Sequence, residues 1–284
     1  MNTQIQTIGI VGSGTMGAGI AQVCAMAGYE VLLFDLKQDI LVRAIQTIEN
    51  NLNKGIERGK ISEEIKINAL DKISVTTELD SLIADLIIEA AIEKLDTKQT
   101  IFTELEKLNK DTTILSTNTS SIPVTRIGSA LENKGRFIGI HFFNPAHLMK
   151  LVEVIPGADT DQHILNEVVD FVKTLGKQPV VASDSPGFIV NRVARHFYVE
   201  SLKVVEDGVA DFETVDRLME NVGFKMGPFR LMDLIGVDTN FSVTNSMYES
   251  FHFDTKFRPN RIQEQKVDAG HFGRKSGKGF YTYD

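Results

Sequence analysis

Short runs of apolar, β-branched residues alternate with longer amphipathic segments over the first part of the chain. Runs typical of buried strands occur over residues 8–11, 31–34, 86–89, 113–115, 137–140, 151–155 and 179–181. Apolar residues at helical spacing predict helices between most of these runs, including 15–27, 40–56 and 63–70. Continuous apolar strands that alternate with helices indicate a largely parallel sheet covered on both faces. The first part of the chain is therefore predicted to be an α/β domain.

The pattern changes at residues 183–187, a turn-rich segment of serine, aspartate, proline and glycine. After this segment the periodicity is only helical, over about 187–207, 211–221, 228–235, 238–251 and 259–268. We therefore expect an α/β domain over residues 1–184 and an all-α domain over residues 185–284. The glycine-rich tail over 270–281 lacks the leading strand and the Ser or Thr of a P-loop, so we interpret it as turns that pack the tail.

A glycine-rich turn joins the first strand to the first helix, and we expect it to bind a dinucleotide through Gly12, Gly14, Thr15, Met16 and Gly17. Gly12 would permit the tight turn, Gly14 the approach of a pyrophosphate, and Gly17 the close packing of helix on strand. The free N–H groups and the dipole of the helix N-terminus favour phosphates. Strand, turn and helix in this order predict a Rossmann-like domain.

Asp35 follows the second predicted strand, where a carboxylate can accept both ribose hydroxyls of NAD and would repel the 2′-phosphate of NADP. The alternative is a simple turn residue at the end of a strand. The combination with the glycine-rich turn favours NAD as the cofactor.

Two residues in the second half of this domain are hard to explain by packing. His141 directly follows the strand at 137–140, and open α/β sheets place their sites at such strand ends. Glu153 lies inside the apolar strand at 151–155, where a charge is costly unless it is paired or faces a cavity. A carboxylate that orients a histidine and stabilises its cation makes a good general base. The alternatives are a structural histidine and a solvent-facing glutamate.

Two further polar positions could complete a site. Ser120 and Asn118 belong to a polar segment, 116–121, that follows the strand at 113–115; the alternative is an N-cap cluster. Asn191 lies one turn into the first helix after the domain break, with an exposed helical asparagine as the alternative.

The overall composition excludes several classes of protein. Of the 284 residues, 42% are apolar and 24% charged, which is typical of a soluble globular protein. The net charge of −8 argues against a nucleic acid or an anionic membrane as a partner, because both need a broad basic surface. The single cysteine, Cys24, permits no internal disulfide and falls at helical spacing among apolar residues, so we interpret it as a core residue. The histidines show no metal-ligand spacing, so no metal is expected.

The N-terminal segment leaves no room for a targeting peptide, because the first apolar strand begins near Ile5. The most apolar stretch, 82–92, is interrupted by Asp85 and Glu89 and is too short to span a bilayer. We therefore expect a cytoplasmic protein.

Taken in order, the motifs resemble those of a known family. They are the glycine turn over 12–17 and the segments 118–121, 141–145, 151–154, 185–192, 226–228 and 273–281. The ordered set strongly resembles the L-3-hydroxyacyl-CoA dehydrogenases, and most of all the bacterial 3-hydroxybutyryl-CoA dehydrogenases, over essentially the full length. The resemblance implies an NAD-dependent oxidoreductase of fatty acid and butanoate metabolism, with acyl-CoA bound between the two domains and a homodimer formed through the helical domain.

The resemblance also implies roles for individual residues. His141 would be the general base and Glu153 its partner, while Ser120 and Asn191 would hold the substrate's oxygen atoms. The remaining matches lie near the nicotinamide or its ribose: Glu93, Lys98, Asn118 and Asn144. Departures from the family pattern, His196 and the polar helix at 238–253, lie in the helical domain, so they bear on the acyl chain rather than on the chemistry.

The basic residues Lys54, Arg58 and Lys60 follow the long helix beyond Asp35 and are candidates for the 3′-phosphate of CoA. The alternative is an ordinary solvated helix face. For the substrate we expect 3-hydroxybutyryl-CoA and acetoacetyl-CoA, with 3-hydroxyadipyl-CoA as the second choice.

Two rival functions differ in their chemistry. A β-hydroxyacid dehydrogenase would use a catalytic lysine in its helical domain, which His141 with Glu153 argues against. A non-catalytic NAD-binding protein on the same scaffold would bind NADH without consuming it.

Overall fold

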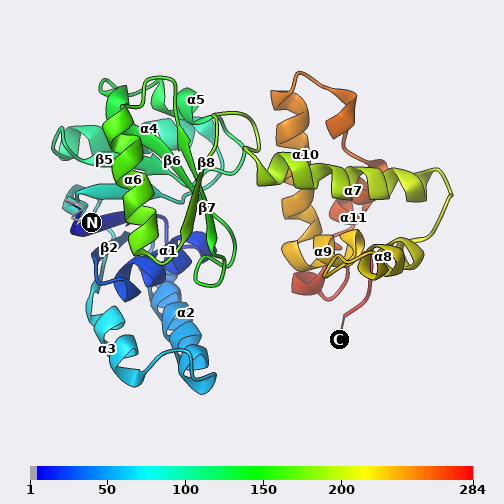
Figure 1. The fold of residues 1–284 in the computed structure, drawn as a ribbon, viewed down its shortest axis with the longest axis horizontal. Helices are drawn as coiled ribbons and strands as arrows, with labels where there is room; N and C mark the ends of the chain where they lie inside the picture. The colour runs from blue at the N-terminus through cyan, green and yellow to red at the C-terminus, as the bar shows by residue number, and fades with distance from the viewer. Residues whose placement is uncertain (1–4, 284) are drawn as a thin grey trace. The chain divides into compact units, whose positions relative to one another are not determined.

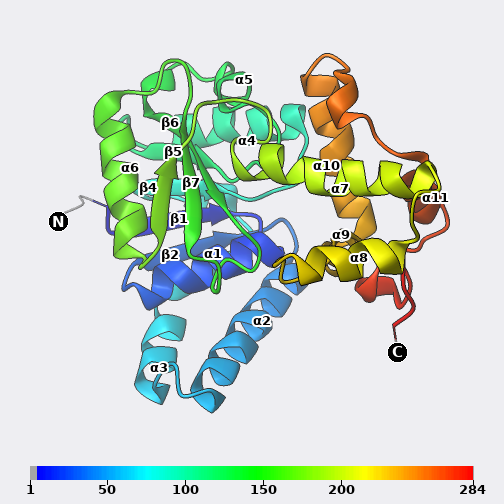
Figure 2. The ribbon, with the colours of Figure 1, turned by 45° about the vertical axis from the view of Figure 1, so that its right-hand side comes forward.

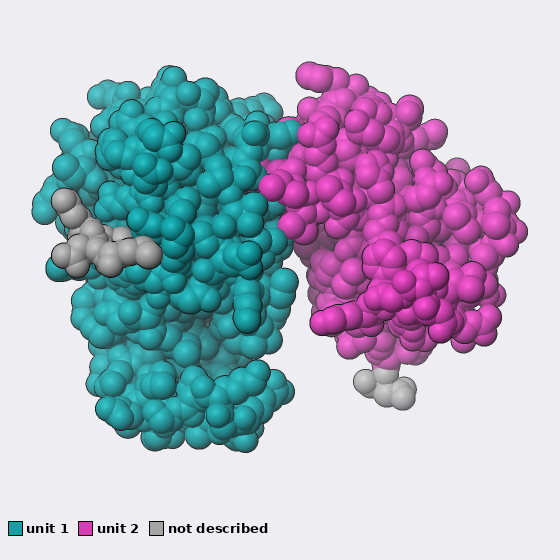
Figure 3. Space-filling view, in the orientation of Figure 1, with its two compact units in different colours: residues 1–185 teal, residues 186–284 magenta. Residues whose placement is uncertain are grey.

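The computed structural model describes residues 5–283, and the chain divides into two compact units, residues 1–185 and 186–284 (Figure 3). The division falls within the turn-rich segment 183–187. Each unit has its own hydrophobic core.

The first unit is built around one eight-stranded sheet with the order β3-β2-β1-β4-β5-β6-β7-β8. Its strands are β1 (Thr7–Val11), β2 (Glu30–Phe34), β3 (Ile73–Thr76), β4 (Leu86–Glu89), β5 (Ile114–Thr117), β6 (Phe137–Phe142), β7 (Leu151–Pro156) and β8 (Gln178–Val181). All neighbouring strands are parallel except β6 and β7. The predicted α/β class and mostly parallel sheet are therefore confirmed.

The edge strand β3 was not predicted from the sequence. It has only four residues, and none of them is fully buried, because β3 pairs with β2 alone. An edge strand of this kind needs no continuous apolar run, so the hydrophobic pattern does not mark it.

Helices cover both faces of the sheet (Figures 1 and 2). They are α1 (Thr15–Met26), α2 (Gln38–Glu57), α3 (Glu63–Asp71), α4 (Leu95–Leu108), α5 (Val124–Gly128) and α6 (Gln162–Thr174). Helices α1 and α6 lie on one face, where Phe171 packs against Tyr29. Helices α4 and α5 lie on the other face, where Phe102 packs edge-on against Phe137 of β6.

The register of the sheet brings several strand ends to one edge. Val11 pairs with Glu89, Glu89 with Thr117, and Thr117 with Gly139, so β1, β4 and β5 end in one row and β6 continues three residues beyond it to Phe142. Strand β7 is antiparallel to β6 and therefore begins at this same edge. The glycine-rich turn and the loops after β4, β5 and β6 consequently share one end of the sheet, which is where open α/β sheets bind ligands.

The second unit is all-helical, as predicted. Its helices are α7 (Val190–Glu206), α8 (Phe212–Asn221), α9 (Pro228–Ile235), α10 (Val237–Ser250) and α11 (Arg261–Asp268). Helix α7 begins three residues later than expected, because Gly187 and Phe188 have φ angles of 73° and 48°, which a right-handed helix does not contain. The core includes the mutually contacting rings of Phe212, Phe229 and Phe280.

The glycine-rich tail is held by a buried carboxylate of this unit. Asp233 on α9 is 1% exposed and accepts hydrogen bonds from the backbone N–H groups of Phe280 and Tyr281 and from the hydroxyl of Tyr283. A Cβ atom at Gly279 would lie 2.0 Å from Asp233 Oδ1, and one at Gly273 would lie 2.3 Å from the Asp233 carbonyl oxygen. The glycines of the tail thus permit close packing on Asp233.

Candidate active site

His141 and Glu153 meet across the one antiparallel pair of the sheet. They are direct register partners on β6 and β7, so their side chains point to the same face. Ile140 and Val154 beside them belong to the core under α1 and α6, which leaves His141 and Glu153 on the face of α4 and α5. His141 Nδ1 lies 2.7 Å from Glu153 Oε2, and the two residues are 4% and 1% exposed. Glu153 therefore orients the imidazole.

Ser120 approaches the other nitrogen of the ring. Its Oγ lies 3.2 Å from His141 Nε2. An ionised carboxylate can only accept, so Nδ1 carries the proton toward Glu153 and Nε2 of the neutral ring is left as an acceptor. This tautomer follows from the hydrogen-bond network. The arrangement provides a basic nitrogen with a hydroxyl group beside it.

Glu93 holds the loop that carries Ser120. Its Oε1 accepts hydrogen bonds from Thr119 Oγ1 and Ser120 N at 2.6 and 2.9 Å, and from the N–H and hydroxyl of Ser121 at 3.1 and 3.2 Å. Burial raises the pKa of Glu93, but the neighbouring Lys98 ammonium and the bonds from Thr119 and Ser120 outweigh it, so this pKa lies below its usual value. Glu93 is thus held as a carboxylate.

Lys98 is buried rather than exposed to a solvent cleft. Its side chain is 1% exposed, and Nζ lies 2.7 Å from Glu89 Oε1 and 3.2 Å from Glu93 Oε2. Glu89 is not among the candidates from the sequence, although a carboxylate at the end of an apolar strand is the same signal that marks Glu153.

The two asparagines lie on loops at the same edge of the sheet. Asn118 is buried, donates its backbone N–H to the Glu89 carbonyl oxygen at 2.7 Å, and accepts from Phe142 N through Oδ1 at 2.8 Å. It therefore ties the ends of β4, β5 and β6 together. Asn144 is exposed, three residues beyond His141, on a loop that packs on α1 where Ala146 meets Gly19.

The glycine turn has the geometry that a dinucleotide site needs. Gly12 has a φ angle of 93°, and a Cβ atom at Gly17 would lie 1.8 Å from the Gly12 carbonyl oxygen, so the strand and helix could not pack with a side chain there. Around Gly14 no side chain or distant backbone atom of residues 5–283 lies within 4 Å of the corresponding position. The first turn of α1, which contains Thr15 and Met16, has no acidic residue that would repel a phosphate.

Asp35 follows β2 beside this turn. Its Oδ2 accepts from Ser13 N and Ser13 Oγ at 2.9 and 3.0 Å, and its Oδ1 receives only a long 3.4 Å contact from Lys37 N. The carboxylate is thus fixed by the turn, with one oxygen placed to accept from a further donor.

A basic pocket of ≈350 Å³ lies between the end of α2 and the loop after β6. The three basic residues selected from the sequence, Lys54, Arg58 and Lys60, all line it, together with His147. Burial lowers the pKa of His147, and the Lys177 charge lowers it further, so its imidazole is neutral at pH 7.

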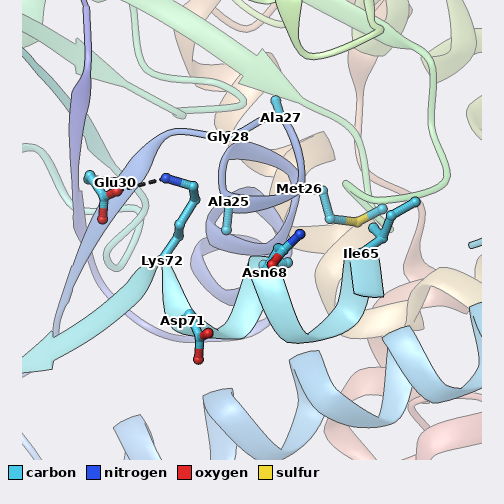
Figure 4. Close-up of a pocket in the computed structure, with 10 residues that line it drawn as sticks. Ala25, Met26, Ala27, Gly28, Glu30, Ile65, Asn68, Asp71 and Lys72 are labelled. Carbon is cyan, nitrogen blue, oxygen red and sulfur yellow. Dashed lines mark hydrogen bonds and ion pairs between the residues drawn. The ribbon is translucent and has the colours of Figure 1, made fainter. Parts of the chain in front are cut away.

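A larger pocket of ≈510 Å³ lies between the C-terminal end of α1 and α3 (Figure 4). The ion pair between Glu30 and Lys72, with Oε1 and Nζ 2.7 Å apart, stands at its edge. Because α1 is about 18 Å long, this pocket lies a full helix length from the glycine turn and is separate from the dinucleotide site.

Asn191 belongs to the helical unit. It is the second residue of α7, not a residue one turn into the helix as the sequence pattern predicts, because α7 begins at Val190. Its part in a reaction stays a prediction. Within residues 5–283 no group of three or more His, Cys, Asp or Glu side chains is placed to hold a metal ion.

Comparison with known families agrees with this geometry. Residues 7–185 match the family described as 3-hydroxyacyl-CoA dehydrogenase, NAD binding domain, and residues 187–283 match its C-terminal domain. The chain belongs to the 3-hydroxyacyl-CoA dehydrogenase family. Membership confirms the resemblance seen in the motifs, the class of NAD-dependent oxidoreductase and NAD as the cofactor.

Individual members of the 3-hydroxyacyl-CoA dehydrogenase family are similar along the whole chain. The 3-hydroxyadipyl-CoA dehydrogenase of Escherichia coli K12 is 44% identical; the match covers 100% of this chain but only 60% of that protein's length. The 3-hydroxybutyryl-CoA dehydrogenase of Bradyrhizobium diazoefficiens is 41% identical over 100% of this chain and 97% of its own. The crystal structure of (S)-3-hydroxybutyryl-CoA dehydrogenase from Ralstonia eutropha has a TM-score of 0.93 at 38% identity and covers 99% of both chains.

Proposed function

We propose that this family member oxidises the C3 hydroxyl of a short-chain L-3-hydroxyacyl-CoA with NAD, and reduces the 3-oxoacyl-CoA in the reverse direction. Our first choice of substrate pair is 3-hydroxybutyryl-CoA and acetoacetyl-CoA. The observation that carries the proposal is the 2.7 Å contact between His141 Nδ1 and Glu153 Oε2, with Ser120 Oγ at Nε2, on the sheet edge that also bears the glycine turn.

In the proposed reaction His141 is the general base. Oxidation of a secondary alcohol removes one proton from oxygen and one hydride from carbon. Bound NAD, which the glycine turn would hold, would supply the acceptor for the hydride from C3. His141 Nε2 takes the hydroxyl proton, and Glu153 stabilises the imidazolium that forms. Ser120 Oγ fixes the position of the reacting oxygen beside Nε2. In the reverse direction the His141 imidazolium returns the proton.

The cofactor is held by residues at one edge of the first unit. The open space at Gly14 and the N-terminus of α1, with Thr15 and Met16, suit the pyrophosphate. Asp35 Oδ1, which receives the long contact from Lys37 N, suits the adenosine ribose. Ala90, which lies beside Gly12, begins the loop after β4, and we expect the nicotinamide on this side of the turn. The remaining proposed contacts, toward the nicotinamide, are Glu93, Lys98, Asn118 and Asn144.

The basic pocket is the proposed site for the phosphates of CoA. Lys54, Arg58 and Lys60 together place three cations around ≈350 Å³ on a protein whose net charge is −8. A local cluster of this kind favours a polyanionic ligand. Charge reversal by Lys54→Glu is expected to raise the KM for acyl-CoA about tenfold or more while leaving NADH affinity unchanged. Unaltered affinity for CoA would remove Lys54 from the site.

In the helical unit, Asn191 is proposed to bind a substrate oxygen, and the unit is proposed to form a homodimer. Large apolar side chains stand exposed on it: Val193, Leu218, Val222, Phe224 and Leu234 are each at least 49% exposed. Apolar side chains exposed to this extent favour association of two copies. Sedimentation equilibrium tests the dimer directly, and a monomer at micromolar concentration would contradict it.

3-Hydroxyadipyl-CoA is the second candidate substrate, and one observation in the helical unit favours it. The Arg195 guanidinium is 2% exposed and donates only to neutral oxygens, those of Asn240 and Thr244. Burial lowers the pKa of Arg195 to about 10. A buried guanidinium whose hydrogen bonds within residues 5–283 include none to a carboxylate suits a substrate that ends in a carboxylate.

Steady-state kinetics with a matched substrate panel tests the function. The panel is 3-hydroxybutyryl-CoA, 3-hydroxyhexanoyl-CoA and 3-hydroxyadipyl-CoA, each with NAD and NADP. We expect turnover with NAD and the highest kcat/KM for the four-carbon substrate. A preference for the adipyl over the hexanoyl ester, which has the same chain length, would select the second candidate. Tight NADH binding without turnover of any ester would overturn the proposal.

The chain's cellular setting is part of the proposal. We place the enzyme in the cytoplasm and in fatty acid and butanoate metabolism, because NAD and CoA esters are used there. We expect it to bind neither nucleic acid nor membranes, given the net charge of −8. Separately, none of the helices within residues 5–283 has the length and apolar character to cross a membrane.

A further inference from the structure

Besides Glu153, a second buried carboxylate lies at the edge of the sheet that carries the site, and the proposed chemistry does not use it. Glu89 is the last residue of β4 and is 0% exposed. Its Oε1 accepts from Ala91 N and from Lys98 Nζ, each at 2.7 Å, and its Oε2 accepts from Thr117 Oγ1 at 2.7 Å. An ionised group this deeply buried is costly, and apolar residues of similar volume can replace such ion pairs without loss of stability. Stability alone therefore does not explain the pair.

Lys98 links Glu89 to Glu93 through contacts with both carboxylates. Its ammonium is 1% exposed and lies between the two carboxylates, 2.7 Å from Glu89 and 3.2 Å from Glu93. Glu93 is 38% exposed and follows β4 on a loop, so Lys98 is its link to the rigid sheet.

Glu93 in turn fixes the loop that carries Ser120. One oxygen of Glu93 faces Lys98, and the other receives four hydrogen bonds from residues 119–121. The Ser120 N–H is one of these donors, and the Ser120 hydroxyl lies 3.2 Å from His141 Nε2. A continuous line of contacts therefore runs from Glu89 through Lys98 and Glu93 to the hydroxyl at the base.

We propose that Glu89 is a positioning residue for the reaction: through Lys98 and Glu93 it holds the Ser120 hydroxyl at His141 Nε2, where the reacting oxygen of the substrate binds. This inference rests on the proposed function. Glu89 acts here only through other residues. Its effect on turnover therefore depends on the presence of the Ser120 hydroxyl.

A double-mutant cycle tests this dependence. Glu89→Gln keeps the shape of the side chain and removes its charge. We expect it to lower kcat about tenfold or more in the wild-type background and less than about twofold in a Ser120→Ala background. A purely structural role would lower kcat by the same factor in both backgrounds, and that result would overturn the proposal. So would an unchanged kcat in folded Glu89→Gln.

A matched control lies at the other end of the same strand. Asp85 directly precedes β4, and its Oδ2 accepts from Gln6 N and Thr7 N, with no link to the Ser120 loop. Asp85→Asn should leave kcat unchanged. If Glu89→Gln does not fold, Thr117→Val removes the hydroxyl that donates to Glu89 Oε2 and accepts from Thr119 N at 3.3 Å, and it is expected to show the same dependence on Ser120. An equal loss in both backgrounds for Thr117→Val would also overturn the proposal.

Hydrogen exchange provides a readout that does not need turnover. In Glu89→Gln the amides of Ser120 and Ser121 should exchange about tenfold faster, because their acceptor Glu93 is released. Unchanged exchange in this segment would overturn the link from Glu89 to Ser120. A wild-type protein that turns over no 3-hydroxyacyl-CoA would instead overturn the proposed function, while the exchange result would still decide the link.

Discussion

Removal of the Glu153 charge should slow turnover without disturbing the fold. Glu153→Gln retains an oxygen that can accept from His141 Nδ1, which now lies 2.7 Å from Oε2. When the imidazolium forms, two unit charges about 4 Å apart attract by about 4 kcal/mol at an effective dielectric constant of about 20. The neutral hydrogen bond that remains contributes about 1 kcal/mol. The net loss of about 3 kcal/mol corresponds to a decrease in kcat of about 10²-fold.

The assay is the initial rate of NADH formation with saturating NAD and 3-hydroxybutyryl-CoA. Thermal unfolding shows whether the variant is folded, and the exposed Glu132→Gln is the matched control, with no change expected in kcat. A folded Glu153→Gln enzyme whose kcat stays within about threefold of wild type, less than about 1 kcal/mol, would refute the reasoning that Glu153 stabilises the imidazolium.

Three further predictions follow from close contacts elsewhere. Gly17→Ala should destabilise the first unit, because its Cβ would lie 1.8 Å from the Gly12 carbonyl oxygen. Gly14→Ala should leave stability unchanged and weaken NADH binding. Equal unfolding midpoints and equal NADH affinities for the two variants would contradict this prediction. Asp233→Ala should lower the free energy of unfolding by about 3 kcal/mol in urea titrations, because three partly buried donors lose their acceptor. The exposed Asp268→Ala is the control, and a similar small effect of both would count against the role of Asp233. The fold lowers the pKa of Glu93, so the stabilising effect of this carboxylate is present above the ordinary carboxyl pKa of about 4.3 and is lost as the pH falls through the lowered value. The difference in Tm between wild type and Glu93→Gln should therefore shrink below about pH 4. A difference in Tm that grows with acid would contradict the assignment.

The sequence predicts the fold well where elements are long or fully buried. The strand at 137–140 and the helix at 211–221 were placed within two residues of β6 and α8, because apolar periodicity reports burial directly. The edge strand β3 was missed because it is barely buried. The start of α7 was misplaced because the left-handed backbone at Phe188 has no signature in a hydrophobic pattern.

The site residues divide in a similar way. His141 and Glu153 could be selected because each is a polar residue in an apolar strand setting, but their meeting depends on the antiparallel register of β6 and β7, which a strand pattern does not contain. Glu89 had the same local signal and was not selected. Its proposed role depends on Lys98, which lies on a different element, α4. The pattern of an amphipathic helix does not show that this lysine is buried.

The most direct test of the central claim is the replacement of the base itself. His141→Ala should lower kcat for 3-hydroxybutyryl-CoA oxidation by about 10²-fold to 10⁴-fold, because Nε2 is the proton acceptor, while its affinity for NADH, measured by fluorescence titration, should stay within about threefold of wild type. A folded His141→Ala protein that turns over at nearly the wild-type rate would contradict the claim that this imidazole performs the proton transfer.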